Sequence, residues 1–105
     1  MAYRDNNTST IASASSITLP PQGDKFVVTG SETITSITRT ALRNFLQRIT
    51  FVGGSSAAVT FTNTNSPELG QMFLQGSDVV LNEQDVIVLV PQIDGSWVLE
   101  STTAS

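Results

Sequence analysis

The chain has 105 residues, of which 39% are hydrophobic and only 13% are charged, with a net charge of −4. This length predicts a single domain with a modest core. The sequence contains no cysteine and no histidine, which excludes disulfides, thiolate metal sites and catalysis by Ser-His or Cys-His pairs. The acidic balance argues against nucleic-acid binding, and no segment reaches the ~18 apolar residues of a membrane span.

The first sixteen residues, MAYRDNNTSTIASASS, are small and polar and show no hydrophobic period. They predict a flexible arm (1–16) in front of one β domain (17–105). Tyr3 and Arg4 near its tip are residue types that anchor protein contacts. We therefore expect them to contact a partner; an N-terminal end without a role is the alternative.

Short alternating runs follow the arm. Ile17 and Leu19 flank a threonine before two prolines, and QGD then provides turn chemistry. The runs KFVVT (25–29) and ETITSIT (32–38) come next. Alternation of apolar and polar residues predicts strands in these segments.

The segment RTALRNFLQR (39–48) interrupts this pattern. Apolar residues with helical spacing occur here: Leu42, Phe45, Leu46 and Ile49. They predict a helical turn or two. Three of the chain's five cations lie off this face: Arg39, Arg43 and Arg48. They form either a solvated helix face or a basic patch that docks on an acidic partner.

The remainder is rich in strand signals. ITFVGGSSAAVTFTNTN (49–65) favours a hairpin or a corner between two strands. Residues 71–103 predict four short strands with turns at 76–77, 82–84 and 93–96. The apolar run DVIVLV (85–90) predicts a strand covered on both faces. Trp97 is expected to be a core anchor whose indole N–H needs an acceptor.

The dipeptide Gly-Ser occurs four times, against about one expected by chance, at a loose period of roughly twenty residues that favours stacked units. The pairs begin at Gly30, Gly54, Gly76 and Gly95. We expect these glycines at turns or corners; a common hairpin dipeptide is the alternative. Around the third pair, Phe73, Val79 and Leu81 are expected in the core. The whole pattern predicts an all-β module of eight to ten short strands, β-helix-like, sandwich or barrel, with one brief helical turn.

Nothing in the sequence has the pattern of an active site. No pair of carboxylates is flanked by aromatic residues as in a glycosidase, and the closest pair, Glu83 and Asp85, lacks the pattern of a calcium loop. FVGGSS (51–56) lacks the lysine and helix start of a phosphate-binding loop. We therefore expect no catalytic residues, no metal, no cofactor and no enzymatic activity.

Three segments carry a resemblance to a known family: ITLP…GDKFVVTGSETITSI, RITFVGG…AVTFTNTNS and LQGSDVVLNEQDVIVLVPQIDGSWVLES. Together they cover about residues 17–101 and resemble a module of structural proteins of tailed bacteriophages. GDKFVVTGSETITSI and DGSWVLES are the most specific parts. The module occurs in tail fibres, tailspikes and head proteins, so the resemblance points to a virion more firmly than to a place in it.

The resemblance implies a short β-helix-like or β-prism module that assembles as a homotrimer. Because the chain begins with its own Met1, whereas a fibre carries such a module inside a longer chain, we expect a capsid decoration (cement) protein on the virion surface. Its partner is then the major capsid protein or another virion protein. The expected contacts are these: Tyr3, Arg4, Arg39, Arg43 and Arg48. The alternatives are a tail fibre, tailspike or tail adaptor component, and a host glycan-binding β module supported by Trp97, Tyr3 and a surface rich in Asn and Thr.

Overall fold

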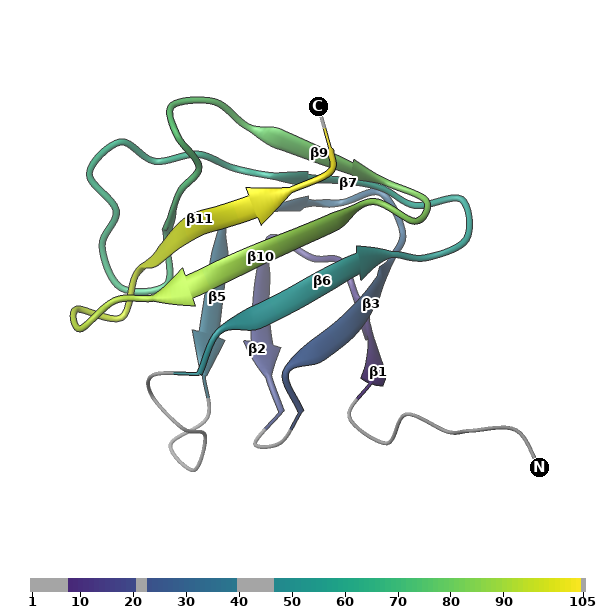
Figure 1. The fold of residues 1–105 in the computed structure, drawn as a ribbon, viewed down its shortest axis with the longest axis horizontal. Helices are drawn as coiled ribbons and strands as arrows, with labels where there is room; N and C mark the ends of the chain where they lie inside the picture. The colour runs from purple at the N-terminus through teal and green to yellow at the C-terminus, as the bar shows by residue number, and fades with distance from the viewer. Residues whose placement is uncertain (1–7, 21–22, 40–46, 105) are drawn as a thin grey trace.

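The computed structural model describes residues 8–20, 23–39 and 47–104, which form an all-β domain (Figure 1). The strands of these residues are β1 (Thr8–Ala12), β2 (Ser16–Leu19), β3 (Lys25–Thr29), β4 (Thr33–Ile34), β5 (Ser36–Arg39), β6 (Ile49–Gly53), β7 (Ala58–Phe61), β8 (Met72–Phe73), β9 (Val79–Asn82), β10 (Val86–Pro91) and β11 (Trp97–Thr102). The described residues contain no helix.

The first half of the domain winds as a coil, because each strand lies parallel to one from the preceding turn. β1 pairs with β3 and β3 with β6, while β2 pairs with β5 and β4 with β7. The amide of Thr50 donates to the carbonyl of Asp24 and that of Gly54 to Val28. Donor and acceptor are 26 residues apart in both bonds, and only a parallel register keeps this separation constant. Residues 8–61 therefore have the β-helix-like arrangement among the predicted alternatives.

The second half closes the coil with antiparallel strands. β9 runs antiparallel to β7, β10 to β6, and β11 to β10, while the short β8 lies parallel to β11. The result is a six-stranded sheet in the order β1-β3-β6-β10-β11-β8, a three-stranded sheet β4-β7-β9 and a two-stranded sheet β2-β5. In Figure 1 the six-stranded sheet lies in front and the two smaller sheets lie behind it.

The three sheets enclose one hydrophobic core. Phe26 and Phe51 lie on neighbouring strands of the large sheet with ring centroids 6.0 Å apart, and Phe61 of β7 approaches Phe51 at 5.5 Å. Tilted ring pairs at these distances stabilise a core by about 0.5–1.5 kcal/mol beyond burial alone. All three rings are inaccessible to solvent, so the aromatic cluster joins the large sheet to the sheet behind it.

The small sheet β2-β5 alternates as a water-facing sheet should. Ile17 and Ile37 point inward and are buried. On the outer face, the Ser36 hydroxyl donates to the Ser16 hydroxyl at 2.9 Å, and the hydroxyls of Thr18 and Thr38 lie 3.2 Å apart. Neighbouring residues of the two strands have the same character, polar or apolar, because the parallel register places residues that are 20 apart in the sequence side by side.

The predicted boundary of the arm at residue 16 is wrong. Thr8–Ala12 forms β1, and Ser16 begins β2. The link between them is held by Ser13, whose amide donates to the Thr29 carbonyl and whose hydroxyl accepts from the amide of Glu32. The small polar residues of this segment are ordered by backbone pairing with β3, and Ile11 is its one partly buried apolar side chain that packs against the core. Residues 1–7 lie outside the described part of the chain.

Three predictions for the segments between residues 40 and 90 can be compared with the structure. The predicted helical turn falls mainly on residues 40–46, which lie outside the described residues; Ile49, the last residue of its apolar face, is in β6. Residues 49–65 form a corner rather than a hairpin, because β6 and β7 belong to different sheets. The strand at 85–90 is not covered on both faces: it alternates between buried and half-buried positions.

The four Gly-Ser pairs lie between strands, two at corners of the parallel coil and two in connections of the second half of the domain. Lys25 stacks on Thr50, so Gly30 and Gly54 stand at nearly equivalent corners of successive turns. Gly76 and Gly95 lie in the β8–β9 and β10–β11 connections. Gly30, Gly76 and Gly95 have positive φ angles of 91°, 101° and 89°, whereas Gly54 does not have a positive φ. The period therefore reflects stacking only for the first two pairs.

Gly53 at the end of β6 is fixed by close approach rather than by its φ angle. Its amide donates to the Asp85 carbonyl, and its carbonyl accepts from the amide of Gln84, both at 2.9 Å. A Cβ at this position would collide with the backbone carbonyl of Asn82. The glycine thus lets the β9–β10 turn lie directly against the coil.

We predict that Gly53→Ala lowers the free energy of unfolding by about 3 kcal/mol, because the obstructing atoms are backbone and cannot rotate away. The matched control is Gly54→Ala, whose new Cβ would meet a Val27 methyl and the Val28 carbonyl oxygen at 3.1 Å. Small shifts relieve such contacts, so the control should lose about 1 kcal/mol. Urea unfolding followed by circular dichroism measures both. Equal losses would contradict the close-approach explanation.

Candidate functional site

The predicted partner contacts are distributed over several parts of the chain. Tyr3, Arg4 and Arg43 lie outside the described residues. Arg39 is the last residue of β5 in the two-stranded sheet, and Arg48 directly precedes β6 in the six-stranded sheet. The two described arginines therefore belong to different sheets, and each has a partner within the chain.

Arg48 forms a surface ion pair. Its Nε lies 2.7 Å from Oε1 of Glu100 in β11, and the two side chains are 62% and 42% exposed. An exposed pair of this kind contributes about 0–1 kcal/mol to stability. Its main effect is to cancel charge on the surface of the large sheet, between the start of β6 and β11.

Arg39 lies over the indole of Trp97. Its guanidinium carbon is 5.0 Å from the ring centroid, a cation–π geometry. Partial burial lowers the pKa of Arg39 from its usual value, although a guanidinium remains charged in proteins. Trp97 is fully buried, and its indole N–H donates to the Ile37 carbonyl at 2.9 Å. This bond joins β11 to β5 across 60 residues of chain.

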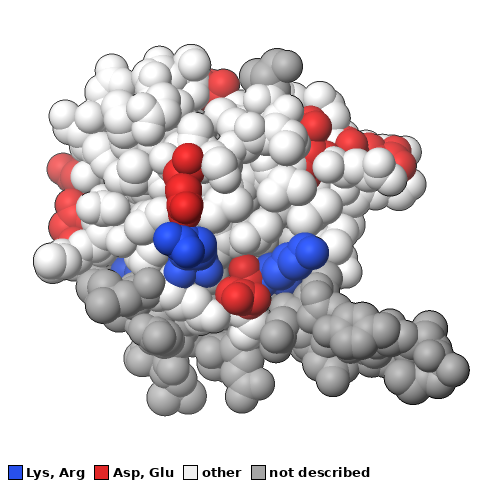
Figure 2. Space-filling view, in the orientation of Figure 1, with Lys and Arg blue, Asp and Glu red and all other residues white. Residues whose placement is uncertain are grey.

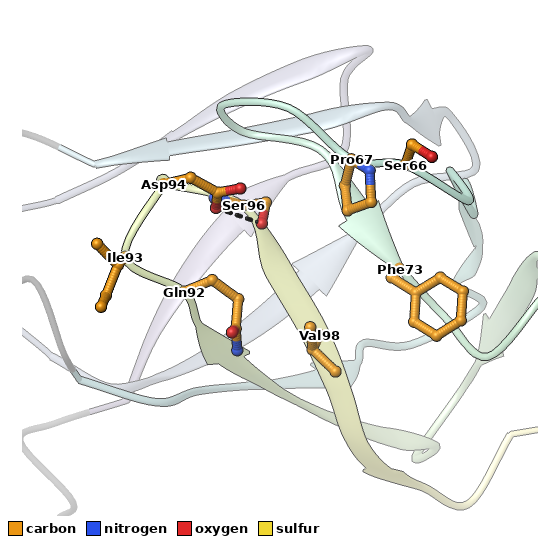
Figure 3. A pocket seen from close by; sticks show the side chains of 8 residues that line it. All are labelled: Ser66, Pro67, Phe73, Gln92, Ile93, Asp94, Ser96 and Val98. Carbon is orange, nitrogen blue, oxygen red and sulfur yellow. Dashed lines mark hydrogen bonds between the residues drawn. The ribbon is translucent and has the colours of Figure 1, made fainter.

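The described residues also form an open pocket at the β10–β11 turn, with a volume of about 610 Å³. Its apolar walls come from Pro67, Phe73, Val98 and Ile93, and Gln92 and Asp94 provide polar groups on the β10–β11 turn. Figure 3 shows the turn residues on one side and Pro67 with Phe73 on the other. Ile93 stands out from the surface with 88% of its side chain exposed.

Asp94 organises the turn at the pocket rim. Its Oδ1 accepts hydrogen bonds from the hydroxyl of Ser96 at 2.6 Å and from the amide of Ser96 at 2.9 Å. These bonds stabilise the carboxylate, so they hold the pKa of Asp94 below its ordinary value. Asp94 is therefore an ionised cap of the turn at neutral pH.

Other carboxylates perform the same structural task. Glu83 accepts from the amide of Ser56, and Asp85 from the amide of Asn82. The closest pair of carboxylates in the sequence is thus used to fasten the β9–β10 turn. Within the described ranges, no cluster of three or more metal-ligating side chains occurs. No helix among these residues is long and apolar enough to cross a membrane.

Sequence reasoning missed the pocket because it placed Phe73 in the core. Met72 and Phe73 are consecutive in β8, so their side chains must point to opposite faces. Met72 takes the buried position, and Phe73 faces the pocket half-exposed. Strand alternation alone signals that only one of the two can be inside. Val79 and Leu81 are buried.

Comparison with protein-family models and with curated protein sequences finds no match for this chain.

We predict that Trp97→Phe lowers the free energy of unfolding by about 2–4 kcal/mol, because it removes the N–H donor to Ile37 and part of a fully buried ring. The control is Val80→Thr, at a position 39% exposed on β9, which should change stability by less than about 1 kcal/mol. Urea unfolding by circular dichroism measures both variants. A Trp97→Phe variant as stable as the parent would show that this hydrogen bond does not contribute to holding β11 against β5.

Proposed function

We propose that this chain is a non-enzymatic structural protein of a tailed-bacteriophage virion, a capsid decoration (cement) protein that binds the head shell as a homotrimer. The proposal takes the virion surface as its location and the major capsid protein or another virion protein as its partner. It rests on the resemblance of residues 17–101 to phage structural modules and on how those residues are used in the fold.

The observation that carries the proposal is the placement of the two most specific motif segments. GDKFVVTGSETITSI contains β3, the Gly30 corner, β4 and the start of β5, which is most of one turn of the coil. DGSWVLES contains the capped β10–β11 turn and most of β11, including the buried Trp97. Both segments supply the framework of the domain, as expected for residues that specify a structural module.

Assembly is supported by the edges of the coil. In the described part of the chain, β1 ends the six-stranded sheet on one side, and an uncovered strand edge presents N–H and C=O groups to further chains. On the other side, β8 is bridged within the chain by Asn63, so β1 is the edge that this argument concerns. Coiled β structures need their ends covered by a cap or a neighbour. A trimer on a shell can supply such neighbours.

The described structure bears differently on the tail alternative and on the glycan-binding alternative. A tail fibre, tailspike or tail adaptor fits the same module and differs only in location. The glycan-binding alternative relied on Trp97, Tyr3 and the surface rich in Asn and Thr. It loses Trp97, whose ring is buried with 0% exposure and cannot stack on a sugar, and Tyr3 lies outside the described residues. Among the proposed capsid contacts, Arg39 and Arg48 have partners within the chain, whereas Tyr3, Arg4 and Arg43 lie outside the described residues.

Cryo-electron microscopy of the virus particles tests the proposal. We expect density that fits this domain at threefold positions of the head. Density confined to the tail would reject decoration in favour of the tail alternative. Particles that carry the chain in neither place would reject the virion role.

We further predict that deletion of residues 1–7 weakens binding to particles without unfolding the domain, because the described pairing begins with Thr8 opposite Lys25. Co-sedimentation with particles and thermal unfolding measure the two effects. The comparison variant lacks residues 1–16 and should also lose stability, because it removes β1 from β3. Unchanged binding after removal of residues 1–7 would exclude Tyr3 and Arg4 as contacts.

A further inference from the structure

The outward faces of the sheets differ in chemistry. The two-stranded sheet presents Ser16, Thr18, Ser36 and Thr38 outward, joined by hydroxyl contacts. The six-stranded sheet presents two rows of apolar side chains, separated by a row in which Lys25, Thr50 and Ser101 flank one valine. Strand alternation assigns these outward residues: Val27, Val52, Val86, Val88, Val90, Val98 and Phe73. All of them are half-buried, while their strand neighbours fill the core.

The register gathers these side chains into continuous rows. Val27 pairs with Val52, which pairs in turn with Val86. Val90 pairs with Val98, which pairs with Phe73 at the pocket. Val88 lies between the two rows, opposite Thr50 and Ser101. The valine face, defined by the seven outward residues above, therefore crosses the sheet from β3 to β8.

The valine face carries little net charge. Figure 2, which views the molecule with this sheet in front, shows a mostly uncharged surface with a few charged groups in its middle and lower middle and further acidic groups along its left and right margins. Arg48 pairs with Glu100 at 2.7 Å, and Lys25 faces outward on β3, beside Thr50. A strongly charged partner gains little from such a surface, whereas a second copy of the same apolar face buries valine against valine.

We propose that the valine face is the surface through which copies of this chain associate, with the face directed towards the axis of the homotrimer. This inference rests on the trimer in the proposed function and adds the surface that forms it. The shell contacts then fall to other parts of the molecule, including the 1–7 segment.

The width of the face suits closure around a threefold axis. The valines lie on four neighbouring strands, β3, β6, β10 and β11, which together span about 19 Å at ~4.8 Å per strand. Three such four-strand blocks, with Phe73 of β8 left at the margin of each, form a triangular prism in which each sheet stands about 5.5 Å from the axis. That is close to half of the ~10 Å that separates sheets packed face to face. Valine side chains can therefore fill the centre without a large cavity.

The area of the face shows what else must take part. All six strands together cover about 30 Å by 18 Å, or roughly 500 Å², whereas a stable interface buries about 800 Å² on each partner. The pocket adjoins this face through Phe73 and Val98. Its rim presents Ile93, 88% exposed, which extends the apolar surface towards the neighbouring copy.

Charge substitution at the centre of the face tests the proposal. In Val88→Lys an ammonium group would have to be buried at the axis, so we expect association to weaken at least about 100-fold. The matched control is Val80→Lys. Val80 is an outward valine, 39% exposed, on β9 of the three-stranded sheet. Analytical ultracentrifugation of the full chain should give trimers for the parent and for Val80→Lys, and monomers for Val88→Lys. Val88→Thr, nearly equal in size, should weaken association about tenfold and guards against a lysine variant that fails to fold.

The inference is overturned if the parent chain is monomeric at micromolar concentration, or if folded Val88→Lys and Val88→Thr associate as tightly as Val80→Lys. Its failure can be separated from failure of the virion role. A chain that decorates particles as separate monomers would contradict the valine-face interface and leave the virion location standing. A trimer that dissociates on Val88→Lys but binds no particle would do the reverse.

Discussion

The parallel pairing of β3 with β6 is the contact on which the rest of the molecule depends. Its register places Phe26 beside Phe51 inside the domain and Val27 beside Val52 outside it. β1 then adds to the free edge of β3, and β10 adds to the other edge of β6. A shift of this register by one residue would exchange the buried phenylalanines with the outward valines. The core and the valine face are therefore two consequences of one alignment.

The second half of the chain holds that coil in place. Gly53 allows the β9–β10 turn to contact the end of β6, and carboxylates fasten the turns that follow. Trp97 ties the last strand to β5 through its bond to the Ile37 carbonyl. Two charged side chains at the pocket and at Trp97 have structural roles: Asp94 caps its own turn, and Arg39 lies over the indole ring of Trp97. The molecule is thus built as a fastened scaffold, which agrees with the structural role that we propose.

Much of the fold could be predicted from local patterns, and the limits have physical causes. Alternation located KFVVT and the later strands, because one face of each is buried. It could not reveal parallel pairing, since a period of two is the same in a coil and in a sandwich. TSTIA (8–12) escaped notice because it is paired along its length with β3 and has a single apolar side chain, Ile11, that packs against the core, which is too few for an alternating pattern. The pocket escaped notice because Phe73 was assigned to the core by residue type rather than by its place next to Met72.

Hydrogen-bond scalar couplings measured by NMR on the isotope-labelled chain test the parallel coil most directly. We predict a coupling from the amide nitrogen of Gly54 to the carbonyl carbon of Val28, and another from the amide nitrogen of Thr50 to the carbonyl carbon of Asp24. Both pairs are 26 residues apart. Couplings between β3 and β6 whose residue numbers have a constant sum rather than a constant difference would show an antiparallel pair, and would contradict the coil and the valine face together.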